Sequence, residues 1–347
     1  MEKSFKTQVK IEDFETLRLI GKGEYGKVLL VRKLSSGELL AMKIIKKKLI
    51  EAKNQVEHTK AERSILEKAT HPYIVRLRYA FHTNLKLYMA MEYCPGGELY
   101  FHLSKYKRFP DDRAKFYAAC IVLALNYLHE NNIIYRDLKP ENIVLDSEGY
   151  PKITDFGLAK ENISIRDLTK TVCGTPEYIA PEIILRQGYG HAVDWWSLGC
   201  IIYEMLVGIP PFYMEERQEI YKNIVQKPVK FLMPMNPLVV DLITKLLHKD
   251  PGQRLGSRGG QEVMNHRWFQ NIDWGALYRK ELKPVFVPSI KNPLDTRYFS
   301  EDFTQSSIAE SPNYDETFAS SPTFGGFSFT ADRNSCTIEL DQEIVNY

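Results

Sequence analysis

The sequence predicts an α+β protein of two lobes, a strand-rich lobe followed by a helical one, because strands come first and helices afterwards. Residues 14 to about 92 consist mostly of short apolar runs, with one helical stretch, NQVEHTKAERSILEKA. After the Pro-Gly stop at CPGGEL, helical periodicity dominates. We place an N-terminal extension at 1–13, the small lobe at 14–92, the large lobe at 93–269 and a tail at 270–347.

The bulk composition is that of an ordinary globular protein. The chain has 347 residues, 44% hydrophobic and 26% charged, and its net charge of +2 gives no reason to expect nucleic acid as a partner. No apolar run reaches the ~18 residues needed to span a bilayer. The first residues, MEKSFKTQVKIEDF, are charged and lack the apolar core of a signal peptide.

The cysteines indicate a reducing compartment. The chain has five of them and none forms a C-x-x-C pair, so neither a disulfide framework nor a zinc site is predicted. They are Cys94, Cys120, Cys173, Cys200 and Cys336. We expect reduced thiols in a cytoplasmic or nuclear protein.

The first motif is IGKGEYGKVLLVRK, which starts at Ile20 and spaces Gly21, Gly23 and Gly26 as G-x-G-x-x-G. That spacing fits a Rossmann helix start, a flap between two strands over ATP phosphates, or a plain Gly-rich hairpin. The next residues, KVLLVRKLSSGELLAMKII, predict strand, turn and strand. A Rossmann fingerprint needs a helix at that point. The strand lysine Lys43 in AMK favours the flap.

The helical lobe begins with a long helix from Asp111, DDRAKFYAACIVLALNYLHE. Its N-terminus is acidic, and its apolar residues recur at helical spacing, at Tyr117, Ile121, Ala124, Leu125 and Leu128. AVDWWSLGCIIYEMLVG and PLVVDLITKLLH predict two further helices.

The segment YRDLKPEN, Tyr135 to Asn142, has the residues that phosphoryl transfer from ATP needs. That reaction requires a base near the acceptor hydroxyl, cations on the phosphates and bound Mg²⁺. Asp137 is suited to accept the hydroxyl proton, Lys139 to reach the γ-phosphate, and Asn142 to bind a metal ion.

The segment DFG follows thirteen residues after Asn142. Asp155 supplies a hard carboxylate for Mg²⁺, and we expect Gly157 to allow a sharp turn. APE follows at 180–182. This order of motifs favours the phosphate flap over the other two interpretations of the glycine motif. Glycine lets backbone amides approach the phosphates there, because it has no Cβ. We expect Val28 to lie against the adenine.

The chain resembles the eukaryotic protein kinases over residues 14–269, and the resemblance extends through the tail. YRDLKPEN, CGTPEYIAPE and DWWSLGCIIYEM resemble the AGC group. Within that group HTKAERSIL, DTRYFSEDF and FGGFSF are most similar to protein kinase B and the serum- and glucocorticoid-regulated kinases. The cyclic-AMP-dependent kinase is the next nearest. The resemblance implies the bilobal kinase fold and transfer of the ATP γ-phosphate to serine or threonine, with Mg²⁺.

The resemblance also implies the nucleotide site. Lys43 binds the α and β phosphates and pairs with Glu62, Met91 is the gatekeeper, and Glu92 to Cys94 form the hinge. The implied nucleotide-binding set is Ile20, Gly21, Lys22, Gly23, Glu24, Tyr25, Gly26, Lys27, Val28, Ala41, Lys43, Met91, Glu92, Cys94 and Glu98.

The implied catalytic set is complete. It comprises Lys43, Glu62, Asp137, Lys139, Asn142 and Asp155, with Asn142 and Asp155 as metal ligands. YRD replaces the commoner HRD, a change that AGC kinases share. An apolar spine joining the lobes is expected at Leu66, Leu77, Tyr135 and Phe156. An ATP-binding scaffold and a cyclic-AMP-dependent catalytic subunit remain as alternatives, although FGGFSF argues against the second.

Four acidic residues match the positions that recognise substrate arginines in basophilic AGC kinases: Glu98, Glu141, Glu177 and Glu204. Carboxylates bind guanidinium groups bidentately, although plain surface glutamates are the alternative. We expect R-x-x-S/T or R-x-R-x-x-S/T sites. Protein kinase B has an acid directly after RYF, whereas this chain has Ser300 and then Glu301, which bears on the far upstream arginine.

Phosphorylation is expected at three positions. Thr171 in KTVCGTPEY matches the activation-loop site, with Arg136, Lys160 and His58 as the cations around it. Ser328 in FGGFSF matches the hydrophobic-motif site. Ser311 is our choice for the turn-motif site, and Ser321, which also precedes a proline, is its rival.

The tail phenylalanines Phe324, Phe327 and Phe329 are expected to dock in a small-lobe groove beside the helix that carries Glu62. The expected partners are protein substrates with basic motifs and an upstream activating kinase of the phosphoinositide-dependent type. We expect a monomer without an N-terminal lipid-binding domain.

Overall fold

The computed structural model describes residues 9–23, 26–164, 167–306 and 324–331. The chain divides into two compact units, which we call the small unit and the large unit. The small unit comprises residues 1–69, 75–95 and 290–347, and the large unit comprises 70–74 and 96–289. The small unit thus extends three residues past our boundary at 92. The tail, which we predicted as one segment, is divided between the two units.

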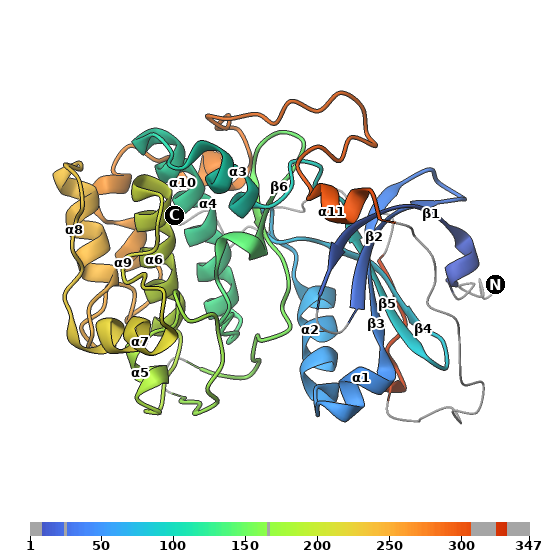
Figure 1. The fold of residues 1–347 in the computed structure, drawn as a ribbon, viewed down its shortest axis with the longest axis horizontal. Coiled ribbons are helices and arrows are strands. Elements are labelled where there is room, and N and C mark those ends of the chain that lie inside the picture. Colours follow the sequence, from blue (N-terminus) through green and yellow to red (C-terminus); the bar gives the residue numbers. More distant parts are fainter. Residues whose placement is uncertain (1–8, 24–25, 165–166, 307–323, 332–347) are drawn as a thin grey trace. The chain divides into compact units, whose positions relative to one another are not determined.

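The small unit is built on a six-stranded sheet in the order β1-β2-β3-β5-β4-β8, with antiparallel pairing throughout. The strands are β1 (Phe14–Lys22), β2 (Gly26–Lys33), β3 (Leu39–Lys46), β4 (Leu77–His82), β5 (Lys86–Glu92) and β8 (Phe329–Thr330). The predicted strand–turn–strand after Gly26 is confirmed as β2 and β3. The last strand comes from the tail and extends the edge at β4 (Figure 1).

The helical segments of the small unit are η1 (Ile11–Asp13), α1 (Lys47–Ala52), α2 (Val56–Lys68) and α11 (Glu301–Thr304). We expected one helix before residue 92, and α2 is that helix. The additional helix α1 has only six residues. Such a short segment carries less than two turns of periodicity, so its buried Ile50 gives no pattern in the sequence.

Alternation along the strands separates two faces of the sheet. One face packs an apolar core made of Phe14, Leu19, Leu29, Val31, Leu40, Met42, Ile44, Phe81, Tyr88 and Ala90. The side chains between these along β2, β3 and β5 therefore point to the other face, which carries the predicted nucleotide-binding residues.

The large unit is mainly helical. Its α-helices are α3 (Leu99–Tyr106), α4 (Asp111–Glu130), α5 (Pro181–Ile184), α6 (Ala192–Val207), α7 (Arg217–Gln226), α8 (Pro237–Leu246), α9 (Gln261–Met264) and α10 (Trp274–Tyr278). Two 3₁₀ helices, η2 (Pro140–Asn142) and η3 (Arg267–Phe269), and one hairpin, β6 (Ile143–Leu145) with β7 (Pro151–Ile153), complete it.

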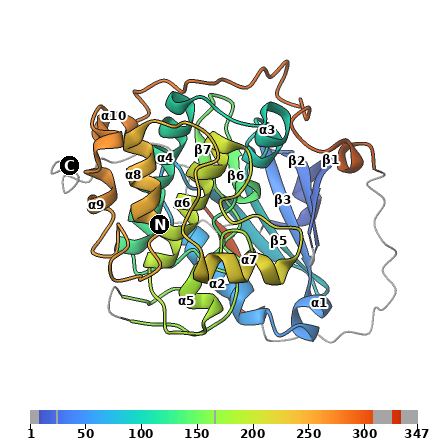
Figure 2. The ribbon, with the colours of Figure 1, turned by 60° about the vertical axis from the view of Figure 1, so that its left-hand side comes forward.

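The helix α4 begins at Asp111 as predicted, and the five apolar residues of its predicted face are all buried. It packs against α6, which in turn packs against α8, so these helices form the core of the large unit (Figure 2). The helix α6 is buried almost all round. Its polar residues Asp194 and Glu204 are therefore held rigidly.

Two features concern the whole described chain. Over the described ranges no helix has the length and apolarity required to cross a membrane. Cys94, Cys120, Cys173 and Cys200 are free thiols.

Candidate active site

The glycine motif forms the turn between β1 and β2, as the flap prediction requires. Gly21 pairs with Val28, and the Gly23 N–H donates to the Gly26 carbonyl over 2.9 Å. A Cβ on Gly26 would lie 1.7 Å from the backbone oxygen of Ile44, so this position accepts no other residue. A Cβ on Gly23 would meet no atom within 4 Å, which leaves that backbone approachable.

The predicted adenine and phosphate contacts lie together on one face of the small-unit sheet. Val28 pairs with Lys43, and Ala41 pairs with Met91. Directly paired residues of antiparallel strands share a face, and residues two apart do as well. These four side chains therefore lie on the face opposite the apolar core.

The ion pair between Lys43 and Glu62 is formed. The Lys43 Nζ donates to the Glu62 Oε1 over 2.6 Å, and the Glu62 side chain is 3% exposed. Removing either partner would leave a buried charge uncompensated. The pair therefore fixes α2 against β3 and holds the ammonium in place.

The end of β5 carries the predicted gatekeeper and hinge. Met91 and Cys94 are buried. The Glu92 N–H donates to the Arg76 carbonyl over 3.0 Å, and the Glu92 carboxylate accepts from the Arg76 N–H over 2.9 Å. The hinge backbone is thus pinned to the segment before β4. Ile20 and Lys22 belong to β1 and Lys27 to β2, while Glu24 and Tyr25 lie outside the described residues.

In the large unit, Asp194 on α6 organises the catalytic loop. Its fully buried carboxylate accepts hydrogen bonds from the backbone N–H groups of Tyr135 and Arg136, over 2.9 and 2.8 Å, and pairs with His129 over 2.8 Å. Arg136 has a left-handed φ of 70°. Non-glycine residues are strained in that region and need surrounding support. We quoted DWW only as a family motif and assigned Asp194 no role.

The predicted catalytic residues Asp137, Lys139 and Asn142 form one hydrogen-bonded network. The Asn142 Nδ2 donates to the Asp137 Oδ2 over 2.8 Å, and the Lys139 Nζ lies 3.0 Å from the same oxygen. The Thr175 hydroxyl donates to the Asp137 Oδ1 over 3.0 Å and accepts from Lys139. Thr175 was missed, although it lies within the quoted motif KTVCGTPEY, because its bond to Asp137 joins residues 38 positions apart.

The two predicted metal ligands are joined through the backbone. The Thr154 N–H, adjacent to Asp155, donates to the Asn142 carbonyl over 2.9 Å. The Asn142 amide nitrogen is directed at Asp137, so its amide oxygen is left for another partner. A carboxylate and an amide oxygen are donors that suit Mg²⁺. The residues therefore fit this ion.

The sharp turn of DFG occurs two positions before the residue at which we expected it. The left-handed residue is Asp155, with φ of 57°, and Gly157 is not among the residues with positive φ. The Gly157 N–H instead donates to the Asp155 Oδ1 over 3.2 Å. Aspartate tolerates the left-handed region because its side chain makes local hydrogen bonds of this kind.

The four residues expected to form the apolar spine are buried within their own units. The rings of Tyr135 and Phe156 meet edge to face with their centroids 5.1 Å apart, and both are buried. Leu66 and Leu77 are buried in the small unit. All four are thus core residues where they lie.

The four predicted arginine-reading glutamates lie close enough to interact electrostatically. Burial, together with the charge of Glu141, raises the pKa of Glu98 to about 7. Burial also raises the pKa of Glu204 to about 7, with Glu141 and Glu177 adding to the effect and the Tyr178 hydrogen bond opposing it. Burial raises the pKa of Glu141 as well. We call these residues the glutamate cluster.

The glutamate cluster has carboxylate oxygens that are available to bind a cation. The Glu141 Oε2 is buried and has no hydrogen-bond partner. Glu204 accepts one hydrogen bond, over 2.6 Å, from the buried hydroxyl of Tyr178. Tyr178 was also missed, because a tyrosine next to a predicted glutamate site carries no separate signal in the sequence. Mutually repelling, desolvated carboxylates are well suited to bind guanidinium groups.

The predicted activation-loop threonine is exposed, and two of its three expected cations lie in the same unit. Tyr189 donates to the Thr171 carbonyl over 2.6 Å and accepts from Arg136 over 3.2 Å. Lys160 donates to the Thr169 hydroxyl over 2.9 Å. The third, His58, belongs to the small unit and bonds Gln55 there.

The tail motif FGGFSF docks on the small unit, as predicted. Phe324 and Phe327 are 1% and 3% exposed, and Phe329 pairs with Ala80 of β4. Arg63 of α2, one residue after Glu62, donates to the carbonyl of Phe327 over 3.1 Å and to that of Ser328 over 3.3 Å. Ser328 itself is exposed, while Ser311 and Ser321 lie outside the described residues.

Comparison with known proteins agrees with this geometry. The protein kinase domain family model matches residues 14–269. The chain is 48% identical over 324 residues to serine/threonine-protein kinase Sgk2 of Homo sapiens, covering 91% of this chain and 88% of that protein. It is 46% identical over 332 residues to RAC-beta serine/threonine-protein kinase A of Xenopus laevis, and 47% identical over 325 residues to protein kinase 2 of Dictyostelium discoideum.

These two matches cover 93% and 92% of this chain and 68% of each relative. The matched region includes every catalytic residue described above. The chain therefore belongs to the protein kinase family and, within it, to the AGC group, in the branch of protein kinase B and the serum- and glucocorticoid-regulated kinases.

Proposed function

We propose that this serine/threonine protein kinase phosphorylates proteins that carry arginine residues upstream of the acceptor hydroxyl. The glutamate cluster supports this most directly. Burial, with a smaller contribution from neighbouring carboxylates, raises the pKa of Glu98, Glu141 and Glu204, and the Glu141 Oε2 has no hydrogen-bond partner in the described part of the chain. Such carboxylates gain most from a ligand cation, and a guanidinium supplies one in a geometry that matches two oxygens.

The chemistry follows from the network around Asp137. Asp137 accepts the proton of the substrate hydroxyl as that oxygen attacks the γ-phosphorus of ATP, and the bond to the departing ADP oxygen breaks. Lys139, held 3.0 Å from Asp137, neutralises charge on the transferred phosphoryl group. Asn142 and Asp155 would hold Mg²⁺, which neutralises the ATP phosphates. Lys43, fixed by Glu62, binds the α and β phosphates.

Activation is proposed to need phosphate on Thr171 and on Ser328. A phosphate adds about −1.5 to −2 charges, and the cations proposed to neutralise it at Thr171 are Arg136, which bonds Tyr189, and Lys160, which bonds Thr169. At Ser328, Arg63 donates to the Ser328 carbonyl, which supports Arg63 as the basic residue that would bind a phosphate there. We propose an upstream kinase of the phosphoinositide-dependent type, a cytoplasmic or nuclear location and a monomeric enzyme.

The acids that follow RYF bear on the preference for a far upstream arginine. Ser300 precedes this helix, and Glu301 and Asp302 form its first turn. Acids are thus present one residue later than in protein kinase B. We propose that an arginine five residues before the acceptor contributes less here than the nearer arginine.

A peptide array with Mg-ATP tests the substrate preference. Peptides of the form R-x-x-S should be phosphorylated with a kcat/KM at least about tenfold above their alanine-for-arginine counterparts, since one charge-assisted bond contributes about 1.5–3 kcal/mol. A wild-type array without arginine dependence would contradict the proposal. An Asp137→Asn enzyme on the same array controls for contaminating kinases.

A further inference from the structure

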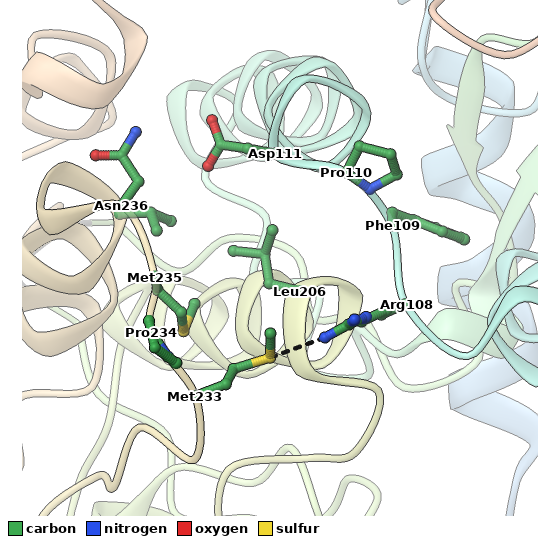
Figure 3. Close-up of a pocket in the computed structure, with 10 residues that line it drawn as sticks. Arg108, Phe109, Pro110, Asp111, Leu206, Met233, Pro234, Met235 and Asn236 are labelled. Atoms are coloured by element: carbon green, nitrogen blue, oxygen red, sulfur yellow. Dashed lines mark hydrogen bonds between the residues drawn. The ribbon is translucent and has the colours of Figure 1, made fainter.

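A pocket of about 430 Å³ lies in the large unit, outside the catalytic network and the glutamate cluster (Figure 3). It is bounded by the loop between α3 and α4, by the C-terminal end of α6, and by the chain that leads into α8. Its volume falls in the range of ligand-binding pockets. No step of the phosphoryl transfer described above uses it.

The pocket is lined mainly by apolar side chains. Phe109, Leu206 and Val239 are 4%, 9% and 1% exposed, and Met233 and Met235 are half-buried along one side. Figure 3 shows Leu206 between Arg108 at one end and Asp111 with Asn236 at the other. Methionine side chains adapt to irregular partners. The shape and chemistry suit an apolar side chain.

Hydrogen bonds hold the walls of the pocket in place. The Phe109 N–H donates to the Met205 carbonyl over 2.6 Å, which ties the α3–α4 loop to α6. The Tyr203 hydroxyl donates to the Lys230 carbonyl over 2.8 Å, which ties α6 to the chain before α8. The pocket is thus preformed, so a ligand pays little to order it.

The chain at 230–236 has the features of an unpaired strand. Exposed and half-buried residues alternate along it, and Leu232 is 63% exposed. The Leu232 N–H is directed at the Tyr203 hydroxyl oxygen, whereas the backbone N–H groups of Met233 and Met235 donate to no residue in the described part of the chain. Extended segments with unused backbone groups pair with strands from other polypeptides.

The charge beside this segment is positive. Arg108 donates to the Met233 sulfur over 3.4 Å, and sulfur is a weak acceptor. Neither Arg108 nor its neighbours Lys105 and Lys107 form an ion pair within the described ranges. At the other end, Asp111 is engaged by Trp268 over 3.2 Å and by Lys115 over 3.6 Å. The charged side chain at this pocket that has no ion-pair partner among the described residues is therefore a positive one, Arg108.

We propose that this pocket docks an extended, acidic segment of a partner protein. An apolar side chain of the partner fills the space above Leu206, its backbone pairs with Met233 and Met235, and its Asp or Glu side chains meet Arg108. The charge of this site is opposite to that of the glutamate cluster. A partner can therefore offer an acidic segment here and arginines at the catalytic centre without competition between the two.

Fluorescence anisotropy on the full chain tests this proposal with two labelled peptide libraries. Both have a central Leu or Phe, flanked by Asp and Glu in one library and by Lys and Arg in the other. The acidic library should bind with a Kd of about 1–100 μM, as transient docking peptides do, and the basic library at least tenfold more weakly. Amide exchange at residues 231–235 should slow when the acidic peptides bind.

Two variants locate the site. Arg108→Glu reverses the rim charge, and Met233→Asp places a charge in the apolar wall, and each should weaken binding at least about tenfold. Arg258→Glu, at a side chain 84% exposed elsewhere in the large unit, is the matched control and should bind as the wild type does. All three should phosphorylate a short arginine peptide normally, which verifies their folding.

The proposal is wrong if the acidic library fails to bind below about 1 mM, or if Arg108→Glu and Met233→Asp bind it like the wild type. Self-association of the chain that Met233→Asp abolishes would show a second copy in the pocket instead. Binding that appears only after residues 332–347 are deleted would show that this chain fills its own pocket. Either result overturns the assignment to a partner protein.

Discussion

At the residue scale, Asp137 is constrained by three neighbours, Thr175, Asn142 and Lys139, which direct it for proton transfer. Asp137→Asn keeps the size of the side chain but removes the base. We expect kcat to fall by about 10²–10⁴, the usual contribution of general-base catalysis. The Kd for ATP, measured by calorimetry, should change less than about threefold, since Asp137 is not a nucleotide ligand. A near wild-type kcat at saturating ATP would rule out this role.

Glu204 is a residue at which function and stability conflict. Its pKa of about 7 lies above the ordinary value of 4.5, so the folded state binds the proton more tightly than the unfolded state. The stability that the proton on Glu204 contributes is therefore fully present below pH 4.5, and it is lost as the pH rises through 7. Glu204→Gln, which keeps an acceptor for Tyr178, should raise Tm at pH 8 by a few degrees.

The same variant should have nearly the wild-type Tm at pH 5, where Glu204 is largely protonated in the folded protein. Differential scanning at the two pH values makes the comparison. A stabilisation of equal size at pH 5 and pH 8 would mean that ionisation of Glu204 is not its cause.

At the element scale, the tail strand β8 and the helix α2 act as one assembly. Phe324 and Phe327 are buried, and Arg63 of α2 donates to the tail backbone next to the Lys43–Glu62 pair. The double change Phe324→Ala and Phe327→Ala should release the tail, because the loss of each buried ring costs about 3–5 kcal/mol of stability. We expect lower kcat and faster amide exchange at residues 56–68, in a sample phosphorylated at Thr171.

Thr330→Ala serves as the control for this experiment, since Thr330 belongs to the same strand but is exposed. It should leave both kcat and exchange unchanged. If the double variant also left both unchanged, the docked tail would have no influence on α2.

The elements that periodicity predicted are those with long or repeated patterns. The helix α4 has five apolar residues at helical spacing, and β2 and β3 flank a clear Ser-Ser-Gly turn. The short helix α1 was missed because its six residues span too few helical turns to show a periodic pattern. The residues named by motif remain predictions as active-site residues. Thr175, Asp194 and Tyr178 were not assigned, because each acts through contacts with residues 26–65 positions away. The turn at DFG was assigned to Gly157 because glycine is the usual left-handed residue, whereas the aspartate supports that conformation through its own hydrogen bond.

At the scale of the whole molecule, the glutamate cluster makes substrate binding depend on pH. The pKa values of Glu98 and Glu204 are about 7, so these carboxyls lose their charge as the pH falls from 8 to 6. A neutral carboxyl attracts a guanidinium only weakly. The KM for an arginine peptide should therefore rise across this range, while the KM for its arginine-free counterpart stays flat. Parallel rises for both peptides would point to the catalytic network instead.

The central claim is that the glutamate cluster of the large unit recognises the arginine of the substrate, and a double-mutant cycle tests it most directly. The kcat/KM of wild type and Glu204→Gln is measured on a peptide with an upstream arginine and on the same peptide with citrulline, which keeps the shape without the charge. We predict that arginine raises kcat/KM at least about tenfold over citrulline in the wild type. In the variant, the free energy that corresponds to this preference should be less than half of the wild-type value. An equal preference for arginine in both enzymes would contradict the account.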